Sequence, residues 1–325
     1  MTRRSDLFPP DRGLQARMLV ALLIAFALVV GVVLGLLWMT QGSWHEQLVG
    51  WMCVAFAGFG WLMGLYYLPS ALERLMDSSG WYLDVTEDQQ ARLEGSVQRL
   101  CVLADMSPPL CSAHPFFLPQ SYTVAKPWRQ PTLYVTAGML RALDDRELDA
   151  VVAHELSHIS NRDAVLMTVL TTPASWLYGR VWDMWRVRHE DSVAGVVSVA
   201  TAVMFLPAVM LIAPVGLALT ASSRVVSRHR ELYADRCAAL LTGSPAGVAT
   251  TLLKISKARG SLRLPDLRTV LARDEYHILP DRPQPTGLGL VWATHPTVPA
   301  RTAALGEMEG ELQQARLRAE VSAEG

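Results

Sequence analysis

The sequence has little charge: only 18% of its 325 residues are Asp, Glu, Lys or Arg, and 51% are hydrophobic. Soluble domains carry about 25% charged residues, so the composition argues against a disordered or collagen-like chain and against an ordinary soluble enzyme with a polar surface. An excess of positive charge is also missing, because the net charge is −1, and this argues against nucleic acid as a partner. The four cysteines are scattered without metal-type pairs or a disulfide framework, which favours a reducing compartment.

Long apolar runs are present instead. Met18–Met39 has 22 residues without a charge and Leu48–Leu68 has 21. As a helix each run is about 30 Å long, the thickness of the hydrocarbon core of a bilayer. We therefore predict a transmembrane hairpin over residues 18–76.

Arginine placement predicts the orientation of this hairpin. The N-terminal tail 1–17 is rich in arginine, the linker 40–47 has neither Arg nor Lys, and Arg74 follows the second run. Positive residues favour the cytoplasmic side. Both ends of the hairpin, and the polar segment that follows it, are therefore expected in the cytoplasm.

The polar segments predict helices and a small sheet. Capping-box patterns begin helices over 86–104 and from Asp144 to about Ser160. Ser121–Ala125 and Thr132–Thr136 have the composition of short strands around a proline-containing turn.

The second of these helices carries the motif His154-Glu155-Leu156-Ser157-His158. Residues i and i+4 lie on one helix face, so two imidazoles can bind one metal ion, and Glu155 can reach an attacking water. The flanking residues are apolar, so the helix is expected to be buried. Two buried histidines and a glutamate require a partner, which a metal ion provides.

Catalytic zinc takes three protein ligands, so a third ligand is expected elsewhere. Glu231 lies in a helical segment and is the best candidate. Asp235 is one turn further on the same face and could accept the spare ring N–H of a ligating histidine. His189 and Glu190 on a charged loop are alternative ligands.

Several ordered motifs together resemble one family. They are the run Glu147–His158, Asn161-Arg162-Asp163, the Glu231–Ala234–Asp235 pattern, Thr294-His295-Pro296 and Arg301. They are similar to the HtpX-type integral-membrane zinc endopeptidases, which are relatives of the CAAX prenyl proteases. The resemblance covers about residues 15–305, although the segment 112–131 matches the usual small-residue strand of the family poorly.

The resemblance implies a zinc site and a mechanism. His154, His158 and Glu231 would bind one Zn²⁺ per chain, and Glu155 would be the general base. His295 would lie near the substrate or the reaction intermediate. We expect His295 or Arg301 to donate a hydrogen bond to the oxyanion.

The expected fold is a mainly α membrane protein with a gluzincin-like zinc protease domain, mostly helical with a small β-sheet, interrupted by further apolar helices. The expected parts are a cytoplasmic tail (1–17), the transmembrane hairpin (18–76), the first part of the protease domain (77–163), an apolar insertion embedded in the membrane (164–223) and the second part of the protease domain (224–325).

The topology of the insertion stays open. His158 and Glu231 must lie on the same side of the membrane to share one ion, so the chain between them crosses an even number of times. Either Ala164–Tyr178 and Ser192–Ser223 both cross, or the longer stretch enters and returns, or neither crosses.

The expected function is hydrolysis of peptide bonds in misfolded or damaged membrane proteins. The enzyme would be a multi-pass protein of the cell membrane with its catalytic domain in the cytoplasm, and its partners would be polypeptide substrates and the lipid bilayer. A peptide is expected to bind in extended form at the edge of the strand near Thr132–Thr136. The alternative is a noncatalytic membrane scaffold or regulator on the same fold.

Overall fold

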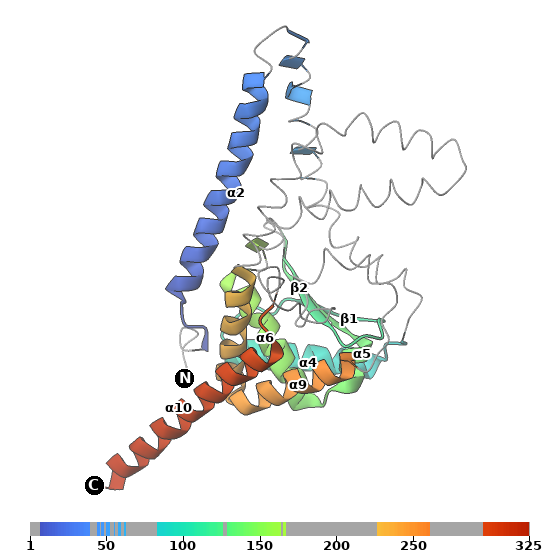
Figure 1. Ribbon diagram of the computed structural model, residues 1–325. Coiled ribbons are helices and arrows are strands. Elements are labelled where there is room, and N and C mark those ends of the chain that lie inside the picture. The colour runs from blue at the N-terminus through green and yellow to red at the C-terminus, as the bar shows by residue number, and fades with distance from the viewer. Residues whose placement is uncertain are drawn as a thin grey trace. The chain divides into compact units, whose positions relative to one another are not determined.

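The computed structural model of the protein describes residues 7–39, 83–125, 129–163, 165–166, 226–260 and 295–324, and scattered positions between 44 and 62 (Figure 1). Most of the second apolar run and almost all of the insertion 164–223 lie outside the described residues, as do the alternative ligands His189 and Glu190. Where the chain is described it is mainly helical with one small mixed sheet, as the sequence predicts.

Tertiary contacts divide the chain into two compact units. The first contains Met1–Leu14, Glu73–Val165 and Ser227–Gly325, and the second contains Gln15–Leu72 and Leu166–Val226. Helix α2 (Arg12–Met39) covers the first apolar run. Among the helices of the described residues, none is both long enough and apolar enough to cross a membrane.

The sheet of the first unit has three strands in the order β1-β3-β2. β1 (Leu110–His114) runs parallel to β3 (Thr132–Thr136), and β2 (Ser121–Val124) runs antiparallel to β3. β2 and β3 confirm the two predicted strands, whereas β1 was not predicted from the sequence.

The central position of β3 corrects one prediction. The sequence predicts a peptide-binding edge near Thr132–Thr136, but β3 pairs with β1 on one side and with β2 on the other. Within the described sheet, β3 therefore has no open edge, and the prediction is wrong.

Both predicted capping boxes are present. Thr86 and Gln89 cap α4 (Glu87–Leu103), and Asp144 and Glu147 cap α6 (Asp145–Asn161). Each box satisfies backbone N–H groups that the first helical turn leaves unpaired. The caps thereby fix where α6 begins and hence which of its residues face inward.

Helix α6 lies at the centre of the first unit and packs against α4, β2 and α9 (Pro245–Gly260). Its buried residues run without a break from Ala150 to His158. An unlabelled helix over 226–242 also belongs to this unit, and α10 (Val298–Glu324) lies beside α9 (Figure 1). The polar residues of the motif are therefore surrounded by protein.

Helix α5 (Ala137–Ala142) follows β3 directly and depends on a glycine. A Cβ atom at Gly138 would overlap the backbone carbonyl of Phe117, which cannot move as a flexible side chain could. We expect Gly138→Ala to lower the free energy of unfolding by about 1–3 kcal/mol, the usual cost of overpacking.

The matched control is Gly95→Ala in α4, where a Cβ would meet no atom within 4 Å. There alanine is expected to raise the free energy of unfolding by about 0.5–1 kcal/mol, because glycine weakens a helix interior. Denaturant unfolding of both variants measures these free energies. Equal changes in the free energy of unfolding for Gly138→Ala and Gly95→Ala would contradict the steric explanation.

Candidate metal centre

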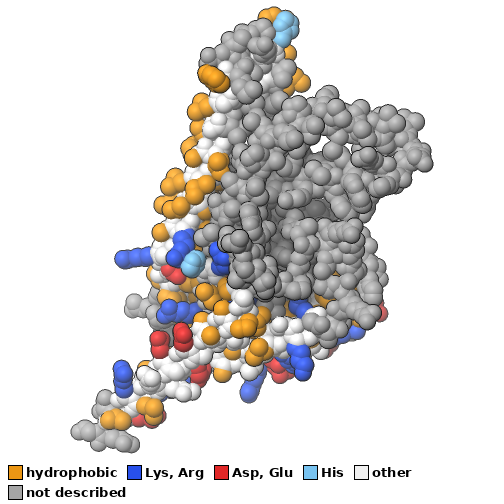
Figure 2. Space-filling view, viewed as in Figure 1, with side chains coloured by type: hydrophobic (Ala, Val, Ile, Leu, Met, Phe, Trp, Pro, Cys, Tyr) orange, Lys and Arg blue, Asp and Glu red, His pale blue; other side chains and the backbone are white. Residues whose placement is uncertain are grey.

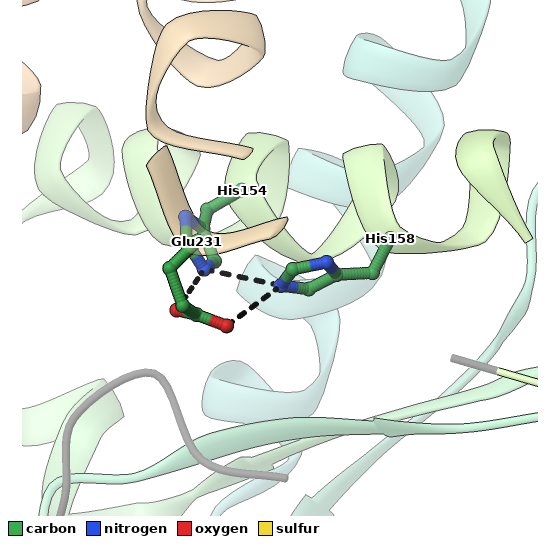
Figure 3. A group of neighbouring side chains, drawn as sticks. All are labelled: His154, His158 and Glu231. Atoms are coloured by element: carbon green, nitrogen blue, oxygen red, sulfur yellow. Dashed lines mark hydrogen bonds and ion pairs between the residues drawn. The ribbon is translucent and has the colours of Figure 1, made fainter. Parts of the chain in front are cut away.

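Three predicted ligands meet in the first unit. His154 and His158 project from α6, and Glu231 projects from the helix over 226–242 (Figure 3). One ligand atom of each residue lies within 4.8 Å of the others, and all three residues are buried. The group could therefore hold one metal ion.

The two imidazole rings approach each other through their Nε2 atoms. Their Nε2 atoms are 3.3 Å apart, and the Glu231 carboxylate closes the triangle, with Oε2 3.4 Å from His154 Nε2 and Oε1 3.7 Å from His158 Nε2 (Figure 3). This geometry follows from the i, i+4 spacing on α6, which places both side chains on one helix face, and the two ring planes are perpendicular to each other.

The opposite ring atoms are held by carboxylates. His154 Nδ1 lies 3.0 Å from Asp235 Oδ1, and His158 Nδ1 forms a hydrogen bond of 3.2 Å with Asp163 Oδ2. A carboxylate at Nδ1 fixes the proton there and leaves Nε2 with a lone pair for a metal ion. Both histidines therefore have the arrangement that metal-ligating histidines commonly have in proteins.

Three cationic or donor side chains surround Glu231. Arg230 Nη2 donates to Oε1 at 2.9 Å, while His295 Nδ1 and Arg301 Nη1 lie 3.3 and 3.4 Å from Oε2. The main contact of Arg301 is elsewhere: its Nε and Nη2 each donate to Asp235 at 2.6 Å. Arg301 thus orients Asp235, which in turn contacts His154.

These contacts shift the ionisation of the buried groups. Burial alone would raise the pKa of Glu231, but His295, His154 and Arg230 lower it well below its ordinary value. Burial alone would lower the pKa of His154, but Asp235 and Glu231 raise it to about 9. The two carboxylates therefore favour the cationic form of the His154 imidazole, as an opposite charge close to a buried group does.

The residues fit a divalent cation in charge and in donor set. The cluster contains four buried carboxylates and two buried guanidinium groups: Glu155, Asp163, Glu231, Asp235, Arg230 and Arg301. With neutral histidines two negative charges remain, which is the charge that one divalent cation neutralises. The three ligand residues together offer two ring nitrogens and a carboxylate, which is a donor set that suits a divalent cation such as zinc.

Glu155 is buried beside the group and its carboxylate contacts β2. Oε1 accepts a hydrogen bond from Ser121 Oγ and Oε2 accepts one from Thr123 Oγ1, both at 2.8 Å. The predicted base therefore directly follows the ligand His154 on α6, and neutral donors hold its two carboxylate oxygens.

The structure brings every predicted site residue into one cluster. His154, Glu155, His158, Glu231, Asp235, His295 and Arg301 are all buried there. Sequence reasoning gave no role to Ser121, Thr123, Asp163 and Arg230. The sequence did contain a feature that could have indicated Asp163: it lies five residues after His158, in the segment Asn161-Arg162-Asp163 that carries part of the family resemblance. Arg162 has a left-handed backbone, with φ of 59°, and ends α6 just before Asp163.

Comparison with known proteins shows which family and which relatives the chain resembles. The profile of peptidase family M48 matches residues 87–309. Protease HtpX homolog 1 of Streptomyces coelicolor is 30% identical over 320 residues, covering 95% of this chain and 97% of its own length. Protease HtpX homolog of Moorella thermoacetica is 30% identical over 315 residues, covering 94% and 98%. A crystal structure of S. mikatae Ste24p aligns with 91% of this chain and 66% of its own, at 15% identity and a TM-score of 0.42.

Proposed function

This chain belongs to peptidase family M48 and is a metalloprotease, and from this premise we propose that it is a zinc endopeptidase with Glu155 as its general base. His154, His158 and Glu231 would hold the zinc ion. The observation that carries the proposal is the meeting of these three buried ligands beside Glu155. Two nitrogens and one carboxylate oxygen form a ligand set common in catalytic zinc sites, which keep one further position open.

When bound, zinc polarises a peptide carbonyl and lowers the pKa of water. The chain's own residues then handle the proton. Glu155 accepts a proton from the attacking water and passes it to the leaving amine, as a carboxylate next to the reacting atoms can. Asp163 and Asp235 keep the two imidazoles oriented while this happens.

Of the two residues predicted to donate to the oxyanion, we retain His295. Its Nδ1 lies 3.3 Å from Glu231 and the residue is 1% exposed, so it is a buried neighbour of a proposed zinc ligand. Arg301 already uses Nε and Nη2 for Asp235. We therefore propose that Arg301 orients the carboxylate behind His154.

We propose that the N-terminal part anchors the enzyme in the cell membrane with its catalytic domain in the cytoplasm. The uncharged runs Met18–Met39 and Leu48–Leu68 support this. Hydrophobic side chains also lie exposed along α2 (Figure 2), among them Leu19, Leu23, Phe26 and Leu34. Lipid would cover an apolar surface of this size. A protease next to a bilayer can reach damaged membrane proteins, which are the proposed substrates.

Metal removal tests the proposed function. Detergent-purified protein should contain about one zinc ion per chain by mass spectrometry and should cleave casein. A strong chelator should abolish cleavage, and stoichiometric zinc should restore it. Undiminished cleavage by metal-free protein would contradict the proposal, and zinc-loaded protein that cleaves neither casein nor membrane-protein substrates would favour a noncatalytic scaffold.

A further inference from the structure

Two hydroxyl groups of β2 donate hydrogen bonds to the carboxylate of Glu155. Ser121 and Thr123 each donate one hydrogen bond of 2.8 Å, one to each carboxylate oxygen. Ser121, Thr123 and Glu155 are 0%, 5% and 2% exposed. Bulk water therefore does not compete for these two hydrogen bonds. Because each carboxylate oxygen accepts one of them, the two bonds together fix the orientation of the carboxylate plane.

Strand β2 holds these two donor side chains in fixed positions. Ser121 and Thr123 are two residues apart, so both side chains leave β2 on the same face. Tyr122 points to the other face and stacks on Tyr134 of β3, with ring centroids 4.9 Å apart. Antiparallel pairing with β3 fixes the backbone beneath all of them. A rotation of the carboxylate would require movement of the strand or loss of a hydrogen bond.

The chemistry of the donors suits a base. Both are neutral, so they orient the carboxylate without neutralising its charge as an arginine or lysine would. Each carboxylate oxygen has two lone-pair sites, so one site on each oxygen stays available after the hydroxyl is bound. A carboxylate held in this way keeps its capacity to accept a proton.

We infer that Ser121 and Thr123 are positioning residues that hold the Glu155 carboxylate in the orientation its reaction with water requires. The inference rests on the proposed function, in which Glu155 is the general base. Catalytic rates are sensitive to such orientation, since a displacement of about 1 Å can cost about 10²-fold.

Thr123→Val tests the inference because it removes the hydroxyl and keeps the shape. We expect kcat to fall about tenfold, with KM within about twofold of the wild type. Thr123→Ser keeps the hydroxyl and should retain kcat within about threefold. The double variant Ser121→Ala/Thr123→Val should lose about 10²-fold. Zinc content should stay at the wild-type level in all of them, which shows that the ligands are undisturbed.

Thr132→Val is the matched control, because it makes the same exchange in β3 at a position assigned no part in the site. Wild-type kcat in Thr123→Val, or equal loss in Thr123→Val and Thr123→Ser with a lowered melting temperature, would overturn the positioning role. A Glu155→Gln variant in the same series separates the two proposals. If Glu155→Gln cleaves as well as the wild type, the proposed function itself fails, whatever the β2 variants do.

Discussion

Glu155→Gln is expected to lower kcat for casein by about 10²–10⁴-fold, the usual contribution of a general base, without loss of zinc. An amide cannot accept the proton of the attacking water at neutral pH, whereas the ligands His154, His158 and Glu231 are unchanged. The fold should also persist. The amide oxygen can accept from one β2 hydroxyl, and the amide nitrogen can donate to the other, because a hydroxyl is both donor and acceptor.

Cleavage rates, zinc content and melting temperature measured on the same preparation check this prediction. The control is Glu94→Gln, the same exchange on the exposed surface of α4, which should leave all three quantities unchanged. Equal cleavage by the wild type and Glu155→Gln would contradict the assignment of the base. A wild type that binds zinc but cleaves nothing would instead support the scaffold alternative.

The local part of this site could be predicted from the sequence. The i, i+4 spacing of His154 and His158 fixes their common face once α6 forms, and the capping box at Asp144 and Glu147 fixes where α6 begins. Both are properties of neighbouring residues. Glu231 and Asp235 followed from the same helical periodicity, applied to a second segment that also resembles a known family.

The nonlocal part could not be predicted. The contacts of Ser121 and Thr123 with Glu155 join residues 34 and 32 positions apart, and no local pattern states which face of a short strand meets α6. The central position of β3 depends on β1, whose residues Leu110–His114 gave no strand signal in the sequence analysis. Strand order is a property of the assembled sheet, and for this reason the predicted peptide-binding edge at β3 was wrong.

Buried charge links the predicted ligands to the residues that sequence reasoning missed. A carboxylate contacts Nδ1 of each histidine: Asp235 contacts His154, and Asp163 contacts His158. Arg230 and Arg301 compensate part of this negative charge next to Glu231. Substitution of a proposed ligand should therefore weaken metal binding more than substitution of a residue that contacts a ligand.

Glu231→Gln is expected to weaken zinc binding by more than about 10²-fold and to abolish cleavage with it. The exchange replaces a charged carboxylate oxygen ligand by a neutral carbonyl, and it removes one of the two negative charges that the cation neutralises. Asp163→Asn is the variant with which this loss of zinc affinity is compared, because Asp163 contacts the ligand His158 and is not itself a proposed ligand. Loss of such a supporting group typically costs about 10–100-fold in metal affinity.

Competition with a fluorescent zinc chelator measures both affinities on detergent-purified protein, and circular dichroism checks that each variant keeps its helices. The predicted order is wild type tightest, then Asp163→Asn, then Glu231→Gln. If Glu231→Gln binds zinc as tightly as Asp163→Asn, Glu231 is not a ligand. The third ligand must then come from another segment, and the charged loop with His189 and Glu190 becomes the first place to test. If the order holds, the two imidazoles are insufficient alone, and the helix over 226–242 completes the metal site.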